Sequence, residues 1–135
     1  MTSALEQLAS TGAIHREPMN EAEYQGLVAS GRARLVDSAR EELTKESRFD
    51  LAYNASHALC LAALRRSGYR LSQRYVVFQV LPHTLGLGPD VWRVLDKAHR
   101  ARNAGEYESF LDVDERLLTE VIGAANRVLE ELEGR

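Results

Sequence analysis

The stretch FDLAYNASHALCLAALRRSGYR, residues 49–70, decides the fold, because its apolar residues recur at helical spacing over several turns. Ser47 before it is the expected N-cap, with Asp50 three residues further on. Gly68 is the expected stop. The alanines at 52, 55, 58, 62 and 63 are small enough for a neighbouring helix to approach closely. We therefore predict a helix over about 48–67, with the single cysteine, Cys60, inside its core face.

Helical patterns also flank this segment on both sides. Asn20 and Glu23 have capping-box spacing and predict a helix from residue 20 to about 46. Residues 72–85 contain YVVFQVL, which favours a short helix, since a lone strand would have no partner. A further helix is expected from Pro89 to about Ala104, where Gly105 ends it.

The last helix is expected to begin at a capping box formed by Asp112 and Glu115. Its apolar stripe continues to Leu132 and is wider than one partner helix requires, so it could serve both the core and a dimer contact. Residues 1–19 fit a packed element poorly, although residues 4–9 could form one or two helical turns. We interpret residues 1–19 as an N-terminal arm that lies on the body or on a partner chain. The predicted fold of residues 20–135 is all-α, an up-and-down four-helix bundle with one short extra helix.

The chain of 135 residues is expected to be one domain with a core of its own. Its start, MTSALEQLAS, lacks the basic and apolar regions of a secretory leader. No run approaches the roughly 20 apolar residues that cross a membrane. These observations predict a cytoplasmic protein that does not enter a membrane.

Charge is uneven along the sequence although its net value is only −3. Residues 65–105 carry eight bases and two acids, whereas residues 106–135 carry nine acids and three bases. One interpretation is internal complementarity, in which the basic middle packs beside the last helix. The other is a local anion site, for phosphate or nucleic acid, in a protein that is otherwise acidic.

Metal and cofactor chemistry finds little support in the sequence. No two of the four histidines are three or four residues apart, and none stands in a metal-binding helix motif. GLGP at residues 86–89 lacks the Gly-Lys-Ser/Thr ending of a phosphate loop. We expect no metal and no cofactor, and the sequence identifies no catalytic residues.

One candidate site remains, in HRARNAGEYES at residues 99–109. His99, Arg102 and Asn103 share a helix face because they are three and four residues apart. With a helix end at Gly105, the chain could fold back and bring Tyr107 beside them. Such a set can bind a phosphate together with a base edge or a ribose. The structural alternative is that Arg102 stabilises a helix C-terminus, Asn103 caps it and Tyr107 packs on the last helix.

From about Glu21 to Leu132, the pattern resembles the HEPN superfamily of small helical nucleotide-binding domains. Three segments carry the resemblance: GLVASGRARLVDSAR, FDLAYNASHALCLAALRRSGYR and HRARNAGEYES. In that family an arginine, usually followed by a polar residue such as asparagine, is separated from a histidine by four to six intervening residues. The pair faces its counterpart across a homodimer and in active members cuts RNA without a metal. Arg102 and Asn103 match this motif, but the motif histidine is absent, since positions 107–109 are Tyr, Glu and Ser.

The resemblance implies a homodimer that binds nucleotides or RNA and is non-catalytic or weakly active, because a tyrosine, whose ordinary pKa is near 10, is a poor base in place of the histidine. An active ribonuclease toxin of a toxin–antitoxin pair is one alternative. A non-catalytic dimeric partner of a nucleotidyltransferase is the other, since such partners modify a tyrosine near this motif in some relatives. His99 is a second-tier contributor in each case.

Overall fold

The computed structural model describes residues 3–73, 76–107 and 113–134, and it describes side chains in these ranges except at 104–107. Its elements, in chain order, are α1 (Ala4–Ser10), β1 (Ile14–Arg16), α2 (Glu21–Ser38), α3 (Lys45–Arg66), β2 (Tyr69–Leu71), α4 (Leu81–Thr84), α5 (Pro89–Tyr107) and α6 (Glu115–Glu133). The expectation of a mostly helical chain is confirmed. The two strands were not expected.

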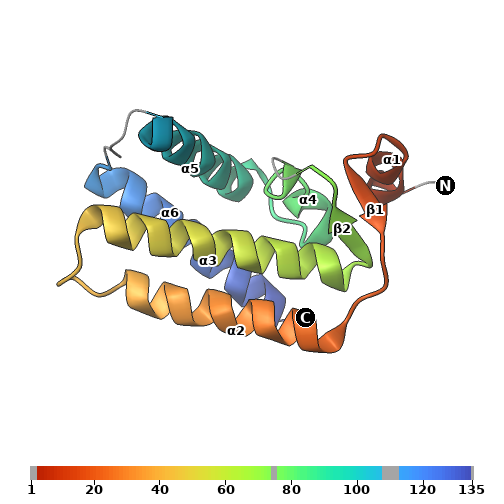
Figure 1. Cartoon of the computed structure of the whole chain (residues 1–135), viewed down its shortest axis with the longest axis horizontal. Helices are drawn as coiled ribbons and strands as arrows, with labels where there is room; N and C mark the ends of the chain where they lie inside the picture. The colour runs from red at the N-terminus through yellow and green to blue at the C-terminus, as the bar shows by residue number, and fades with distance from the viewer. Residues whose placement is uncertain (1–2, 74–75, 108–112, 135) are drawn as a thin grey trace.

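Helix α3 is central, because it packs against α2, α5 and α6. Figure 1 shows α2 and α5 on opposite sides of α3, with α6 crossing behind it. Helices α2 and α3 run in opposite directions, and α1, β1, β2 and α4 gather at one end of the molecule (Figure 1). Within the described residues, no helix has the length and apolar character needed to cross a bilayer.

The core follows from the apolar faces of the long helices. In α3 the buried side chains include Phe49, Leu59 and Cys60, none of which is exposed to solvent. The prediction for Cys60 is therefore confirmed, and burial raises the pKa of its thiol. The wide stripe of α6 is buried at Leu117, Leu118, Val121, Ala124, Ala125, Val128 and Leu132. Since α6 packs against α2, α3 and α5, contacts inside the chain account for this width.

The predicted boundary between the first two long helices is wrong. Helix α2 ends at Ser38 instead of about residue 46, and the N-cap of α3 is Thr44 instead of Ser47. The Thr44 hydroxyl accepts the backbone N–H of Ser47 at 3.1 Å. Arg48 Nε donates to the carbonyl of Ser38 at 2.8 Å and satisfies a group that the helix end would otherwise leave open. The turn is thus stabilised from the α3 side, which helical periodicity does not reveal.

Two other predicted boundaries also change. Asp114 is the N-cap of α6, with its carboxylate accepting the N–H of Leu117 at 2.7 Å, while Asp112 lies outside the described residues. Helix α5 continues through Gly105 to Tyr107, so the predicted end at Gly105 is wrong. A glycine inside a helix costs only about 0.5–1 kcal/mol relative to alanine, so it does not by itself end one. Gly68, at φ 90° just after α3, ends its helix as predicted.

The end of the molecule near β1 and β2 differs most from expectation. Ile14, His15 and Arg16 pair antiparallel with Leu71, Arg70 and Tyr69. Residues 1–19, interpreted as an arm, therefore contribute a helix and a strand. Of the helix expected over 72–85, only α4 is α-helical in the described residues, and turns precede it. The observed strand β2 lies before YVVFQVL, and its partner β1 lies more than fifty positions earlier in the chain.

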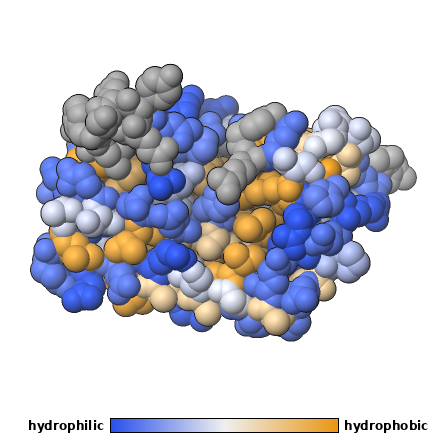
Figure 2. Space-filling model, in the orientation of Figure 1, coloured by the Kyte–Doolittle hydropathy of each residue, from blue (hydrophilic) through white to orange (hydrophobic). Residues whose placement is uncertain are grey.

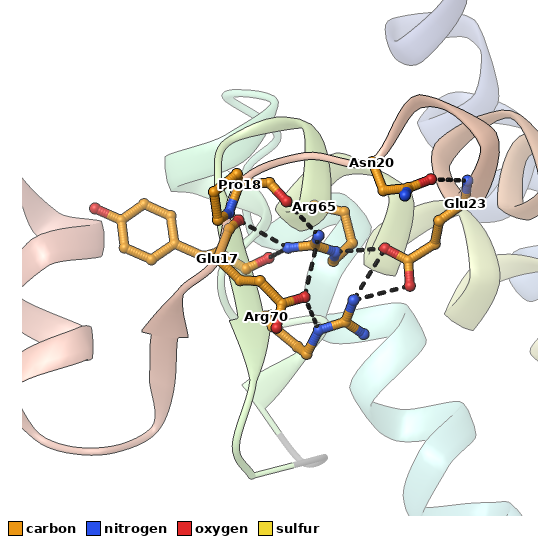
Figure 3. A network of polar contacts seen from close by, with 7 residues as sticks. Glu17, Pro18, Asn20, Glu23, Arg65 and Arg70 are labelled. Carbon is orange, nitrogen blue, oxygen red and sulfur yellow. Dashed lines mark hydrogen bonds and ion pairs between the residues drawn. The ribbon is translucent and has the colours of Figure 1, made fainter.

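A buried arginine joins these parts (Figure 3). The side chain of Arg65 is only 1% exposed, and its guanidinium donates to the carbonyls of Glu17, Pro18 and Tyr69 at 2.8–3.0 Å. Its Nε donates to a Glu23 carboxylate oxygen at 2.7 Å. Burying a charge this deeply is costly unless it is paired and hydrogen-bonded, and here several donors have acceptors.

Glu23 and Arg70 extend the same network. The Asn20 side chain accepts the N–H of Glu23 at 2.9 Å, which confirms the predicted cap. Glu23 does not complete a reciprocal capping box, because its carboxylate binds Arg65 and Arg70. Hydrogen bonds from Arg65 and then Arg70 lower the pKa of Glu23 below its ordinary value of 4.5. Arg70 also pairs with Glu17, so both carboxylates are shared between the two arginines.

Helices α2 and α3 approach closely at Gly31. A Cβ at this position would lie 2.6 Å from Leu59 Cγ and 2.7 Å from its Cδ2. We predict that Gly31→Ala lowers the free energy of unfolding by about 1–3 kcal/mol, because the added methyl overpacks this contact. Gly26→Ala, in the same helix with nothing within 4 Å of the added Cβ, should raise stability by about 0.5–1 kcal/mol. Urea unfolding measures both, and equal effects of the two substitutions would contradict the close approach.

The network also predicts a pH dependence. Because the folded chain favours the ionised form of Glu23, this contribution is complete above pH 4.5 and is lost as the pH falls through the lowered folded pKa. We expect Glu23→Gln to be less stable than the wild type at pH 7, and this difference to shrink below pH 4.5. Urea midpoints between pH 7 and pH 3 test it. Glu21→Gln, an exposed neighbour bonded only to Gln25 among described residues, is the control and should show a small, flat difference.

Candidate functional site

The residues singled out by the sequence lie at the C-terminal end of α5. His99, Arg102 and Asn103 are in its described part, and Tyr107 is its last residue. Because the helix continues, Tyr107 lies about 140° around the helix axis from Arg102, and the chain does not fold back at Gly105 as predicted. The side chain of Tyr107 is outside the described residues, so its role in the site stays a prediction.

His99 is bonded at both ring nitrogens. Its Nδ1 lies 2.8 Å from the Tyr53 hydroxyl of α3, and its Nε2 lies 3.2 Å from Nδ2 of Asn103. With this placement of the amide, Nε2 accepts from Asn103 and Nδ1–H donates to the phenol oxygen. Turning the amide by 180° reverses the direction of both bonds. The predicted shared face of His99 and Asn103 is therefore a direct contact.

Arg102 contacts two residues of α3. Its Nε donates to Asp50 Oδ1 at 3.1 Å, and its guanidinium carbon lies 5.0 Å from the centre of the Tyr53 ring. The side chain of Arg102 is 31% exposed, and that of Asp50 is 52% exposed. A pair this exposed contributes little to stability, about 0–1 kcal/mol. Arg102 is thus held in place while staying accessible from solvent.

Tyr53 contacts both His99 and Arg102. It is buried, and its ring also stacks with the His99 ring at 6.1 Å and an angle of 22°. Phe78 packs edge-on to Tyr53, His57 and His99, with ring centroids 6.0–6.4 Å apart. These aromatic contacts hold the His99 ring in place, and the Tyr53 ring packs against the Arg102 guanidinium. We call Asp50, Tyr53, His99, Arg102 and Asn103 the α3–α5 cluster.

Asp50 and Tyr53 were not expected at this site. Asp50 was expected only at a helix start, three residues after Ser47, and Tyr53 falls within the helix expected over about 48–67. Their spacing of three places both on one face of α3, but nothing in the sequence indicates that this face meets the end of α5. An aspartate and a tyrosine on one face of the predicted central helix were the available signal.

Other possible sites are weaker. An open pocket of about 290 Å³ lies between α5 and α6 and is lined by Asp90, Val91, Val94, Glu120, Gly123, Ala124 and Arg127. Its α5 residues are at the N-terminal end of that helix, away from Arg102. In the described part of the chain, no group of three or more His, Cys, Asp or Glu side chains could hold a metal ion.

Comparison with known proteins adds no assignment. No family model, no curated protein and no solved structure matches this chain. The chemistry of the α3–α5 cluster is therefore argued from its own residues.

The Tyr53–His99 contact predicts a change in tautomer. In Tyr53→Phe the Nδ1–H of His99 loses its acceptor, so the ring should shift toward the Nε2–H form, with the Asn103 amide turned to accept. The ¹⁵N shifts of the His99 ring measure this change. His83, exposed in α4, is the internal control and should not move. Unchanged His99 shifts would show that the phenol does not determine its tautomer.

Proposed function

We propose that this chain is a HEPN-like protein that binds a nucleotide or an RNA phosphate at the α3–α5 cluster. On this proposal α2, α3, α5 and α6 form the up-and-down four-helix bundle of that superfamily. One observation carries the assignment: a partly exposed arginine is held by an aromatic ring and a carboxylate, directly beside a bonded histidine–asparagine pair. The resemblance of HRARNAGEYES to the HEPN motif supports it.

Each residue has a distinct task in this proposal. Arg102 binds phosphate oxygens, for which the planar guanidinium is well suited. Asn103 contacts a ribose or a base edge, and His99 adds a hydrogen bond to the same ligand. Tyr107 donates from the end of the helix. Without the motif histidine, the site binds and does not cut, or cuts only weakly.

Asp50 has the opposite effect on an anion. Its carboxylate accepts from Arg102 Nε at 3.1 Å, where an incoming phosphate would also bind. A phosphate at Arg102 must therefore displace this carboxylate or lie beside it, at an electrostatic cost in either case. The ion pair with Asp50 therefore holds Arg102 in position in the free protein, and it weakens the binding of an incoming anion to Arg102.

Binding measurements test the site directly. We predict that Arg102→Ala weakens binding of nucleoside monophosphates and short RNA by about 10- to 100-fold, the value of a charge-assisted hydrogen bond of about 1.5–3 kcal/mol. Asp50→Asn should strengthen binding several-fold. Arg34→Ala, in the exposed part of α2, controls for loss of one positive charge. Binding that is absent, or unchanged in Arg102→Ala, contradicts the proposed function.

A ribonuclease of a toxin–antitoxin pair is the second candidate, and one contact favours it. The His99 imidazole and the Arg102 guanidinium both pack on Tyr53, so a possible base and a possible phosphate ligand are close together. In this case RNA is cleaved in the presence of a chelator, and His99→Gln and Arg102→Ala each stop cleavage. RNA that is bound but stays intact supports the binding protein instead.

Assembly is part of the proposal. A homodimer places the Arg102 residues of two chains in one shared cleft, and a nucleotidyltransferase-type protein is the proposed partner of the non-catalytic alternative. Light scattering at micromolar concentration measures the dimer. A monomer that still binds nucleotide through Arg102 would contradict the shared cleft and would support a site formed by one chain.

A further inference from the structure

Apart from Arg102, the described basic residues in the middle of the sequence divide into two sets in the structure. Arg65 and Arg70 pair with Glu17 and Glu23, and Arg66 donates to the Tyr24 hydroxyl and to a carbonyl of α6. Internal complementarity accounts for this first set. The acids involved come from the N-terminal part of the chain, and not from the acidic last helix as the sequence suggested.

The second set lies on α5 and has no such partners in the part of the chain that the structure describes. Arg93, Lys97 and Arg100 are all exposed, and among the described residues none of them has a carboxylate within 4 Å. Spacings of four and three residues place them within about 60° of the helix circumference and over about 10 Å of its length. We call these three residues the α5 basic stripe.

Exposed arginines elsewhere provide the contrast. Three of them form ion pairs at 2.6–2.8 Å, namely Arg16 with Glu6, Arg32 with Glu133 and Arg40 with Glu42. Although α6 packs against α5, no ion pair of the described residues joins the stripe to α6. The positive charge of the stripe therefore faces solvent. Figure 2 shows hydrophilic residues over α5, while hydrophobic residues gather over α3 near α4.

Acidic residues limit the width of the stripe. Asp90 and Asp96 lie on α5 at about 60° to either side of its centre line. A broad positive surface, as a duplex requires, is therefore absent from the described part of this helix. A narrow line of cations fits the backbone of one strand.

The position of the stripe connects it to the proposed site. Asn103 follows Arg100 by three residues, so it is the residue of the α3–α5 cluster that neighbours the stripe. Arg102 lies about 160° around the helix axis from Arg100, so a strand bound along the stripe reaches Arg102 by passing around α5 beside Asn103. At its other end, the Arg93 guanidinium lies 5.4 Å from the centre of the half-buried Trp92 ring. A basic line with an aromatic residue beside it is the usual composition of a single-strand binding surface.

We propose that the α5 basic stripe binds the sugar–phosphate backbone of a single nucleic-acid strand, one phosphate of which occupies the site at Arg102. This inference rests on the proposed function and narrows it: the ligand is a strand and not a free mononucleotide. The three stripe residues supply phosphate contacts that are independent of base identity. The α3–α5 cluster supplies the contacts to one nucleotide.

The test compares an RNA octamer of uridine with uridine monophosphate, at several salt concentrations. In the triple variant Arg93→Gln, Lys97→Gln and Arg100→Gln, octamer affinity should fall at least tenfold. The slope of log K against log salt should become shallower by about 2, since each phosphate contact on a single strand contributes about 0.7. Affinity for the monophosphate should not change, because the stripe does not contact it.

A matched triple variant removes the same charge elsewhere. Arg16→Gln, Arg32→Gln and Arg34→Gln lie in β1 and α2, away from α5 (Figure 1). This variant should keep both the octamer affinity and the salt slope. Equal losses of octamer affinity in the two triple variants would reflect net charge alone and would overturn the proposed role of the α5 basic stripe.

Other outcomes separate the inference from the proposed function. If Arg102→Ala abolishes monophosphate binding while the stripe variant leaves octamer affinity and salt slope unchanged, the function stands and the stripe is wrong. If the octamer binds through the stripe and Arg102→Ala changes nothing, the strand surface stands and the Arg102 site is wrong. An octamer of glutamate that binds as tightly as the RNA would overturn the assignment to nucleic acid.

Discussion

The buried guanidinium of Arg65 is the interaction on which the arrangement of the first seventy residues depends. Its acceptors come from the segment before α2, from the first turn of α2 and from β2. An apolar side chain of similar size could fill the volume but could not satisfy three backbone carbonyls at once. The contact therefore specifies where the N-terminal segment lies as well as holding it there. Removing Arg65 would take the donor away from these carbonyls, and an unsatisfied buried acceptor costs about 1–3 kcal/mol.

The long helices could be predicted because each carries its own local signal. Apolar periodicity marks α3 and α6, Asn20 caps α2, and Gly68 ends α3. The boundaries that were wrong depend on partners distant in space or on a choice between similar residues. Thr44 and Ser47 are both good N-caps, and the contact of Arg48 with the end of α2 favours the observed turn. The pairing of β1 with β2 joins residues more than fifty positions apart, which single-sequence periodicity does not detect.

Only the part of the candidate site that lies on α5 could be predicted from the sequence. Spacing along α5 was enough to place His99, Arg102 and Asn103 together. The contributions of Asp50 and Tyr53 require knowledge of which face of α3 meets α5, and that is decided by packing of the whole core. Charge counts along the sequence likewise indicated a basic middle segment. They did not separate Arg65 and Arg70, which form ion pairs with acids of the same chain, from the exposed bases of α5.

The length of α3 also has a practical consequence. The Arg65 network and the Asp50–Arg102 pair occupy opposite ends of this one helix, fifteen residues or about 22 Å apart. An affinity tag, a fluorophore or a fused protein at the N-terminus attaches to the end that carries Arg65. Labelled protein can therefore report on ligands at the other end with little direct interference from the label. A tag placed in the segment between α5 and α6 would have no such separation.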